Sequence, residues 1–401
     1  MRGLPCLPRS LVMNAGPLFK LSSLLLGAAL SFSGTSALAQ ATVKIGSVLS
    51  VTGPAAFLGE DMKAGMELAV EEINAKGGVA GKKIDWVFYD AESQTQKGLT
   101  ATRRLLDQDK VDMVVGGGNM SGMAIAMLGL TEKASVPFIS TEGAMDIVTP
   151  VAERQWTFKS TADDEQVMER LADYYAKKGI KKVAFLGDSS GFGQGAAVQL
   201  KKVAARRGLD VMYESFNPSD TDLTPQLGKI KAAGVQSIIC WTVTPAGVVF
   251  LKQAQQLGMD QMNLIHSYGF VDKRYMDLAG DAAKNLLLVS VKFPVGAQLP
   301  DSDPQKSRIA SLTQAFEAKY KRKPNQFAAQ TYDAIYLARA AIERANGADR
   351  TKVRDALTGI SNWPGVGGVF NFSPQRHSGL SKDDLVLLSY SGGAFQLADY
   401  K

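Results

Sequence analysis

The side chains that most often carry catalysis or bind metals are scarce in this chain. It has two histidines, His266 and His377, and neither has another histidine or a cysteine at the spacing of a zinc site. No Gly-x-Ser-x-Gly nucleophile motif is present, and no phosphate loop ends in Gly-Lys followed by Ser or Thr. Carboxylates are numerous, but no pair stands out. We therefore expect neither a catalytic centre nor a bound metal.

One glycine motif could hold a dinucleotide. Gly191, Gly193 and Ala196 fit Gly-x-Gly-x-x-Ala after an apolar run, and Glu214 follows about 20 residues later. The residues at 187–190, however, lengthen the turn before the first glycine, and the tight turn of the dinucleotide fingerprint has no room for them. We therefore expect no cofactor.

Alternating apolar and amphipathic segments must position any site. Strand-like runs recur at 43–49, 83–89, 111–115, 136–139, 182–186, 211–216, 237–241, 264–267 and 286–291. Helical patterns lie at 94–106, 196–206, 245–257 and 326–345. This alternation predicts an α/β fold with parallel sheets wrapped by helices. Open sheets of this kind bind ligands at the carboxyl ends of their strands, as in the turn that begins at Thr52.

The first strand–helix–strand unit also resembles a known family. Its turn TGPAAFLG, helix ending INAKGG and strand IDWVFYDAES are similar to type I periplasmic solute-binding proteins, in the branched-chain amino-acid-binding group of ABC importers. The helix portion AAQTYDAI at 328–335 is similar to the same family. The resemblance implies two Rossmann-like α/β lobes, joined by a three-crossover hinge, with a ligand cleft between them.

The resemblance sets the expected division of the chain. We expect a signal peptide at 1–39, lobe one at 40–161 plus 292–383, and lobe two at 162–291 plus 384–401. After the signal, about 360 residues exceed what a single core usually holds, which agrees with two domains.

The loop at 117–122 matches the family loop in which a serine and backbone N–H groups hold the ligand's carboxylate. Ser121 falls on that serine. An oxyanion needs donors, and a loop that enters a helix presents free N–H groups with a favourable dipole. The alternative is that the loop only caps a helix that starts at Met123. The neighbouring candidates for ligand contact are Asn119, Met120 and Gly122.

The second loop and the ammonium site depart from the amino-acid-binding members. The second loop offers Glu142, Gly143 and Ala144, and Ala144 replaces a threonine, so only backbone groups could bind there. Tyr268 stands where those members carry the glutamate that pairs with the ligand's α-ammonium. An ammonium group without a charged partner would be costly to bury, although Glu142 or Asp188 could substitute.

The remaining candidates are large and apolar. Phe192 takes the place of the aromatic residue over the ligand, Val243 replaces a tyrosine, and Leu58 stands where the first loop usually offers a tyrosine. The predicted cavity wall comprises Phe57, Leu58, Met120, Phe192, Trp241 and Tyr268. Such a wall suits an aromatic or other hydrophobic carboxylate, with a branched-chain amino acid as the alternative. Several of these aromatic residues, Trp241 above all, could instead belong to the core.

The first 39 residues are typical of a secretory signal. Basic residues precede an apolar run at 21–32, and small residues end it at 37–39, which predicts cleavage after Ala39 and export to the periplasm. The alternative is a membrane anchor, but a run of about a dozen residues is short of the roughly 20 that span a bilayer. Cleavage removes Cys6 and leaves Cys240, which we expect to be buried and inert.

The charge balance gives no support for nucleic-acid binding. Removal of the signal lowers the count of Lys and Arg from 45 to 42, against 39 Asp and Glu, so the formal net charge falls from +6 to +3. Two basic clusters are explained by solvated surfaces, because neither fits the pattern of interleaved aromatic residues of a nucleic-acid module; they are Lys177, Lys178, Lys181 and Lys182, and Lys319, Lys321, Arg322 and Lys323.

These observations predict the extracytoplasmic substrate-binding component of an ABC importer. It would bind a small carboxylate between its lobes and deliver it, as a monomer, to a membrane permease. The ATPase would be a separate chain, and no enzymatic activity is expected. The alternatives are a periplasmic sensor that serves a receptor and an exported α/β oxidoreductase.

Overall fold

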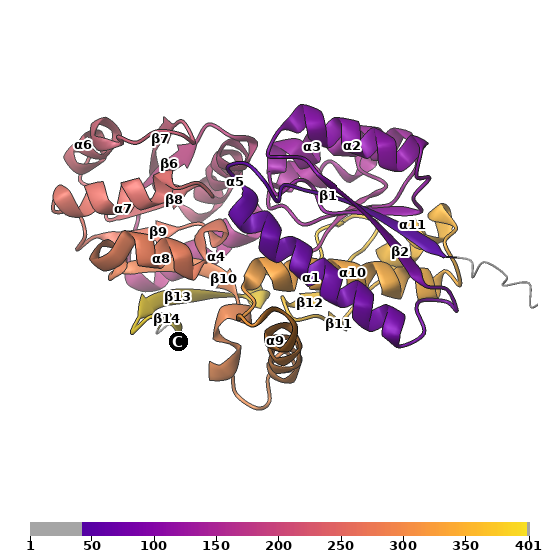
Figure 1. Ribbon diagram of the computed structural model, residues 1–401. Coiled ribbons are helices and arrows are strands. Elements are labelled where there is room, and N and C mark those ends of the chain that lie inside the picture. The colour runs from indigo at the N-terminus through magenta and orange to yellow at the C-terminus, as the bar shows by residue number, and fades with distance from the viewer. Residues whose placement is uncertain (1–41, 399–401) are drawn as a thin grey trace, which may run out of the picture. The chain divides into compact units, whose positions relative to one another are not determined.

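Two sheets with helices on both faces form the fold (Figure 1). The computed structural model describes residues 42–398, so the expected signal peptide at 1–39 lies outside the described residues. The first sheet has five parallel strands in the order β2-β1-β3-β4-β5. Its strands are β1 (Val43–Leu49), β2 (Ile84–Asp90), β3 (Met113–Val115), β4 (Phe138–Ser140) and β5 (Thr157–Lys159). This order reverses direction between β1 and β3, as in doubly wound folds.

Helices cover both faces of the first sheet because side chains of β1 point alternately to each face. Ile45 packs in one apolar cluster with Met66 and Ile335, whereas Val48 packs in another with Leu105 and Met127. The helices on the first face are α1 (Ala56–Ala75) and α10 (Gln326–Arg344), with α11 (Arg350–Thr358) packed on α10. Those on the second face are α2 (Thr95–Asp107) and α3 (Ser121–Lys133).

The second sheet has seven strands in the order β14-β13-β10-β9-β8-β6-β7. Its strands are β6 (Lys182–Asp188), β7 (Asp210–Phe216), β8 (Ser237–Trp241), β9 (Asn263–His266), β10 (Leu286–Val291), β13 (Leu385–Ser391) and β14 (Ala394–Leu397). The strands from β6 to β10 are parallel and repeat the order of the first sheet. The antiparallel strands β13 and β14 extend one edge and were not predicted from the sequence.

The second sheet is also covered on both faces. Ile239 of β8 packs with Val167 and Leu200, whereas its neighbour Cys240 is fully buried on the opposite face with Phe250. The helices on the first of these faces are α4 (Asp164–Lys178) and α5 (Gly191–Arg207). Those on the second are α6 (Thr224–Ala232), α7 (Ala246–Gln256) and α8 (Lys273–Ala279). Burial raises the pKa of the Cys240 thiol, which keeps it protonated.

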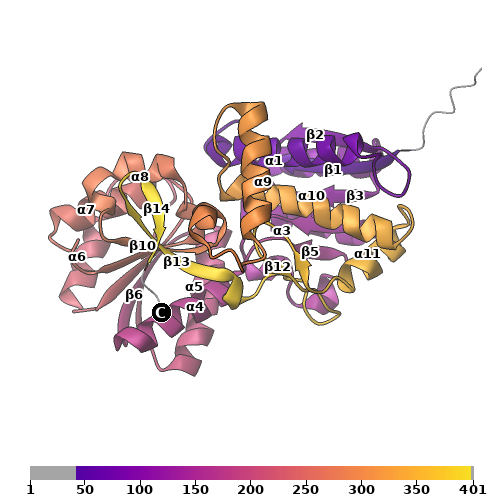
Figure 2. The same ribbon diagram turned by 90° about the horizontal axis from the view of Figure 1, so that it is seen from below.

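The chain passes between the two sheets three times: after β5, after β10 and before β13. Figure 2 shows α10 and α11 beside the first sheet, while β13 and β14, in yellow, belong to the second. The intervening segment also contains α9 (Lys306–Tyr320) and the short hairpin of β11 (Trp363–Pro364) and β12 (Val369–Phe370). The lobe boundaries given above stay a prediction.

Helix caps account for one clear difference from the predicted elements. α5 begins at Gly191 rather than at Ala196, because the Ser190 hydroxyl accepts hydrogen bonds from the N–H groups of Phe192 and Gly193. The glycine motif at this position therefore lies in the first turn of a helix. Among residues 42–398, no helix has both the length and the hydropathy that crossing a membrane requires.

Candidate functional site

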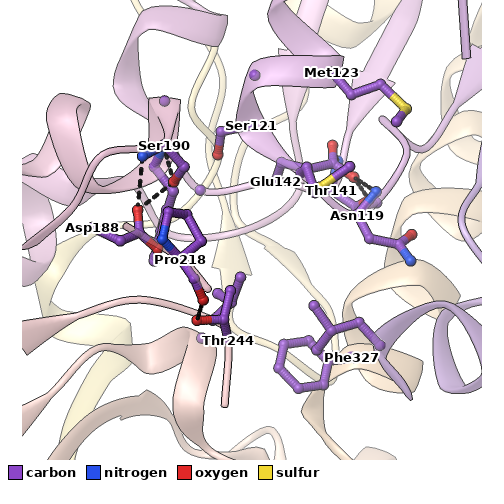
Figure 3. A pocket seen from close by; sticks show the side chains of 18 of the residues that line it. Asn119, Ser121, Met123, Thr141, Glu142, Asp188, Ser190, Pro218, Thr244 and Phe327 are labelled. Atoms are coloured by element: carbon purple, nitrogen blue, oxygen red, sulfur yellow. Dashed lines mark hydrogen bonds between the residues drawn. The ribbon is translucent and has the colours of Figure 1, made fainter. Parts of the chain in front are cut away.

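A cavity of about 290 Å³ lies where strand ends of both sheets meet. The segments after β1, β3 and β4 line it from the first sheet, and the segments after β6, β8 and β9 line it from the second. The start of α10 adds Phe327 and Gln330. In Figure 3, Asp188 and Ser190 lie on one side of the cavity, and Glu142 and Asn119 lie on the other. Doubly wound folds bind their ligands at such strand ends, so this cavity is the candidate site.

Most of the site residues proposed from the sequence line this cavity. They are Leu58, Asn119, Met120, Ser121, Gly122, Glu142, Gly143, Phe192, Val243 and Tyr268. Residues more than 200 positions apart in the sequence are thereby brought together, as Leu58 and Tyr268 show. Their contact with a ligand stays a prediction.

Three proposed residues, Phe57, Ala144 and Trp241, do not line the cavity. The ring of Phe57 packs edge-on against Tyr275, with ring centroids 5.2 Å apart. Trp241 is fully buried, and its ring centroid lies 5.3 Å from that of Phe192. Trp241 therefore supports the aromatic wall from the core. Ala144 is also fully buried.

The cavity contains further residues that the sequence reading missed. They are Met62, Thr95, Met123, Thr141, Ser190, Gly191, Pro218, Thr244, Gly269, Phe327 and Gln330. Thr141, Ser190 and Thr244 follow strands closely, so the strand-end rule could have found them. Met62 and Phe327 lie on helices, and only the packing of α1 and α10 over the sheet reveals them.

Ser121 is the first residue of α3, and the alternative that the loop caps a helix from Met123 is wrong. The N-cap is Met120, whose side chain makes no capping bond. The Ser121 hydroxyl instead accepts the N–H of Ala144 at 3.2 Å, which joins the first two ligand loops. Within residues 42–398, the N–H groups of Ser121 and Gly122 have no protein acceptor. The start of α3 thus offers a hydroxyl and two amides to an anion.

Glu142 is fully engaged by the loops around it. Its carboxylate accepts the N–H groups of Gly117 at 3.0 Å and Asn119 at 3.2 Å, and the Ser140 hydroxyl at 2.6 Å. Thr141 donates both its N–H at 3.0 Å and its hydroxyl at 2.9 Å. Burial raises the pKa of Glu142, while the bonds from Ser140 and Thr141 lower it. A carboxylate has about four lone-pair positions, so these donors saturate it.

Asp188, the second carboxylate in the wall, is also occupied. One oxygen accepts the N–H of Ser190 at 3.1 Å and its hydroxyl at 2.5 Å. The other oxygen accepts the Thr242 hydroxyl at 2.6 Å. Asp188 is 2% exposed. Asp188 therefore orders the loop before α5. The Ser190 hydroxyl in this loop also accepts the N–H groups of Phe192 and Gly193, which a dinucleotide phosphate would need.

A buried cation lies beneath the second loop. Lys159 is fully buried and donates from Nζ to the carbonyl oxygens of Gly143 at 2.6 Å and Ala144 at 3.3 Å. Burial lowers the pKa of Lys159, and the carboxylates of Asp163 and Asp164 oppose that shift. None of the described residues that line the cavity is Lys, Arg or His. The lining thus offers neutral donors and two engaged carboxylates, with Lys159 behind it.

Tyr268 presents its ring to the cavity and keeps its hydroxyl in the interior. Its ring packs edge-on against Phe192 at 5.7 Å between centroids. The hydroxyl has no hydrogen-bond partner among the described residues. Burial, with a smaller contribution from the Asp164 carboxylate, raises the pKa of Tyr268 well above its ordinary value. Where the amino-acid-binding members are expected to carry a glutamate, this site therefore has an aromatic surface.

The part of the chain that the structure describes contains no group of three or more His, Cys, Asp or Glu residues that could hold a metal. The cavity lining combines hydrogen-bond donors, the carboxylates of Glu142 and Asp188, and apolar surface, a combination that suits binding of a small molecule.

Comparisons with known proteins agree with a binding role. The sequence profile of the family described as "Periplasmic binding protein" matches residues 42–389. The leucine-, isoleucine-, valine-, threonine- and alanine-binding protein of Pseudomonas aeruginosa is 28% identical over 347 residues, which are 84% of this chain and 88% of that protein. Leu/Ile/Val-binding protein homolog 3 of Brucella melitensis is 28% identical over 333 residues, with 82% and 85% covered.

Solved structures show the same fold. An extracellular ligand-binding receptor from Rhodopseudomonas palustris HaA2 superimposes with a TM-score of 0.82 at 24% identity, over 90% of this chain and 100% of that one. The branched-chain amino acid transporter substrate binding protein LivJ of Streptococcus pneumoniae, in complex with isoleucine, gives 0.76 at 26% identity, over 89% and 99%. The predicted two-lobed α/β fold and the family resemblance are confirmed. The chain belongs to the periplasmic binding protein family and has the type I fold of its leucine-binding members.

Proposed function

We propose that this protein is the substrate-binding component of an ABC importer and that its ligand is a small, largely apolar carboxylate without an ammonium group. Membership of the periplasmic binding protein family supports the role in transport. The ligand class follows from one observation: both carboxylates in the cavity wall, Glu142 and Asp188, already accept hydrogen bonds from protein donors.

The start of α3 would bind the carboxylate of the ligand. Ser121 and Gly122 line the cavity at the start of α3, where free N–H groups and the helix dipole favour an anion. Behind this loop, the buried Lys159 donates to the carbonyl oxygen of Gly143 and so holds the second loop in place. Neutral hydroxyl and amide donors can hold a carboxylate of the ligand by direct hydrogen bonds.

An α-ammonium group would have to compete with protein donors at both acids of this site. Glu142 is saturated by five donors, and Asp188 is held by Ser190 and Thr242. Transfer of an ammonium group from water to a site without a charged partner costs several kcal/mol. The position expected to provide that partner is Tyr268, whose hydroxyl is buried against the backbone of Gly143 and carries no charge.

The remaining wall suits a hydrocarbon or aromatic body. Leu58, Met120, Phe192, Val243 and Tyr268 supply apolar surface from both sheets. Phe327 adds a further ring from the start of α10. A ring or branched chain of the ligand would pack between these side chains and exclude water from the bound carboxylate.

The ligand would stabilise the closed arrangement of the two lobes because its contacts come from loops of both sheets. A ligand shifts such an equilibrium only by its difference in affinity for the two states. The closed monomer, exported after cleavage of residues 1–39, would then deliver the ligand to a membrane permease. The protein would act by binding and not as an enzyme. Neighbouring permease and ATPase genes would distinguish this role from that of a sensor.

A thermal-shift screen of residues 40–401 tests the ligand class. Benzoate, phenylacetate and 4-methylpentanoate should each be compared with leucine, isoleucine and valine. A ligand at about 100 times its dissociation constant stabilises a protein by roughly 2.7 kcal/mol, which raises the melting temperature measurably. We expect shifts with the acids that lack an amino group. A shift with leucine, isoleucine or valine alone would favour the second candidate ligand, an amino acid. The similarity to the Pseudomonas aeruginosa protein supports that candidate.

A further inference from the structure

A cluster of charged and amide side chains joins the two sides of the cleft outside the ligand cavity. We call it the interlobe ion-pair cluster; it consists of Asp61, Asp272, Arg274, Arg322 and Asn325. Asp61 lies on α1, and Arg322 and Asn325 lie just before α10, all on the side of the first sheet. Asp272 and Arg274 lie at the start of α8, on the side of the second sheet.

Arg274 is held in position by its own side of the cleft. The carboxylate of Asp272 accepts Nε of Arg274 at 2.9 Å and Nη2 at 2.6 Å, a two-point contact that fixes the plane of the guanidinium group. Nη2 then reaches across the cleft to Oδ2 of Asp61 at 2.8 Å and to the carbonyl oxygen of Phe57 at 2.9 Å. Because Arg274 is already ordered, little side-chain entropy is lost when this contact forms.

Asn325 closes the cluster from the other side. Its Nδ2 donates to Oδ2 of Asp61 at 2.7 Å and to Oδ2 of Asp272 at 2.8 Å, so one amide group bridges both sides. Its Oδ1 accepts the N–H groups of Phe327 at 3.1 Å and Ala328 at 3.2 Å, which caps α10 and fixes the orientation of the amide. Arg322 also pairs with Asp61.

The interlobe ion-pair cluster is continuous with the cavity wall. Phe57, whose carbonyl binds Arg274, directly precedes Leu58 in the cavity lining. Tyr275, next to Arg274, packs against the ring of Phe57 and donates its hydroxyl to the carbonyl oxygen of Val243 at 2.5 Å. Movement of α8 away from α1 would therefore break the cluster and displace Leu58 from Val243 across the cavity.

We propose that Arg274 is a positioning residue for ligand binding, which stabilises the closed form through Asp61 and Phe57 before any ligand is bound. The proposal rests on the proposed function, because it requires two lobes that open and close. The side chains of Asp61 and Asp272 are each 4% exposed, so these carboxylates need their partners in the closed form. The side chain of Arg274 is 46% exposed, which limits its effect to a few-fold change in the ratio of closed to open protein.

Distance measurements between the lobes test this proposal without a ligand. Spin labels at Thr100→Cys on α2 and Val198→Cys on α5 occupy exposed sites on opposite sides of the cleft. Pulsed electron-resonance spectra of the ligand-free mature chain would then give the populations of short and long distances. We expect Arg274→Ala to lower the ratio of closed to open protein about fivefold, and Arg274→Lys to lower it less.

Lys273→Ala is the matched control, because Lys273 pairs with Asp277 on its own helix and reaches no residue across the cleft in the described structure. It should leave the distance distribution unchanged. High salt should shift the unsubstituted protein toward the open form and shift Arg274→Ala much less. A wholly open unsubstituted protein, or equal populations in Arg274→Ala and Lys273→Ala, would overturn the proposal. Since no ligand is used, a wrong ligand class would not affect this result.

Discussion

The hydroxyl of Tyr268 lies directly over the backbone of Gly143, so that a β-carbon on Gly143 would lie 1.4 Å from the hydroxyl oxygen. Gly143 follows β4 of the first sheet, and Tyr268 follows β9 of the second. The same β-carbon would lie 3.0 Å from the ring of Phe192. The absence of a side chain at Gly143 therefore allows the two sides of the cavity to meet.

Substitution of Gly143 by alanine should prevent this approach. A methyl group at that distance would push the Tyr268 hydroxyl away from the backbone of Gly143, so Gly143→Ala should hold the cleft open. We expect ligand affinity to fall at least about 100-fold, since the loops of the two sheets could no longer contact one ligand. Isothermal titration calorimetry with a ligand from the thermal-shift screen measures the change.

Gly129→Ala is the matched control for that substitution. Gly129 lies within α3, and a β-carbon there would have no neighbour within 4 Å. This change should leave affinity intact and stabilise the protein by up to about 1 kcal/mol, because alanine favours helix. Unchanged affinity in Gly143→Ala would contradict the close contact with Tyr268.

Glu142→Gln should destabilise the protein. A glutamine amide offers two N–H donors where Glu142 now accepts from Gly117, Asn119 and Ser140, so buried donors would face each other. An unsatisfied buried polar group costs about 1–3 kcal/mol. Urea unfolding would measure the loss. Glu153→Gln, at a side chain that is 69% exposed, serves as the control, and an equal effect of both changes would argue against the role given to Glu142.

Asp333 should give the protein a pH-dependent stability. It is 1% exposed and accepts the N–H groups of Val366 at 2.9 Å and Gly367 at 2.7 Å, and burial raises its pKa from 3.8 to about 7. The folded protein thus holds this proton more tightly than the unfolded chain does. The contribution of Asp333 to the free energy of unfolding therefore falls as the pH rises from about 4 to about 7, and is constant above that.

Comparison with Asp333→Asn isolates this contribution. The difference in free energy of unfolding between the unsubstituted protein and Asp333→Asn should decrease across that window, by at most about 1.4 kcal/mol per pH unit. Urea titrations at several pH values measure it, with Asp107→Asn, at an exposed position, as the control substitution. A difference that does not change with pH would contradict the assignment.

The sequence predicted the parallel strands well where long apolar runs specify them. The runs at Ser237–Trp241 and Leu286–Val291 coincide with β8 and β10. β5 has only three residues and ends in the buried Lys159, so its composition does not indicate a strand. The hairpin of β13 and β14 has its own local signal, an apolar run followed by Gly392 and Gly393, both at positive φ, and the sequence analysis missed it. Only the pairing of β13 with β10 depends on tertiary structure.

The site was predictable where it follows strands. The strand-end rule and the family resemblance together placed Ser121 and Tyr268 near one cavity. The saturation of Glu142 could not be foreseen, because its donors Gly117 and Asn119 come from a loop on the neighbouring strand. The interlobe ion-pair cluster joins side chains more than 200 positions apart, as Asp61 and Arg274 show, and only the folded chain reveals it.

Leucine and 4-methylpentanoate differ only in the amino group, so they test most directly whether this site lacks an ammonium partner. Both should be titrated into residues 40–401 by isothermal calorimetry at neutral pH. With Glu142 and Asp188 occupied by protein donors, we expect 4-methylpentanoate to bind at least about ten times more tightly than leucine, a difference of about 1.4 kcal/mol. Tighter binding of leucine would show that an acid in the cavity is free to pair with the ammonium group, and would contradict the proposed ligand class.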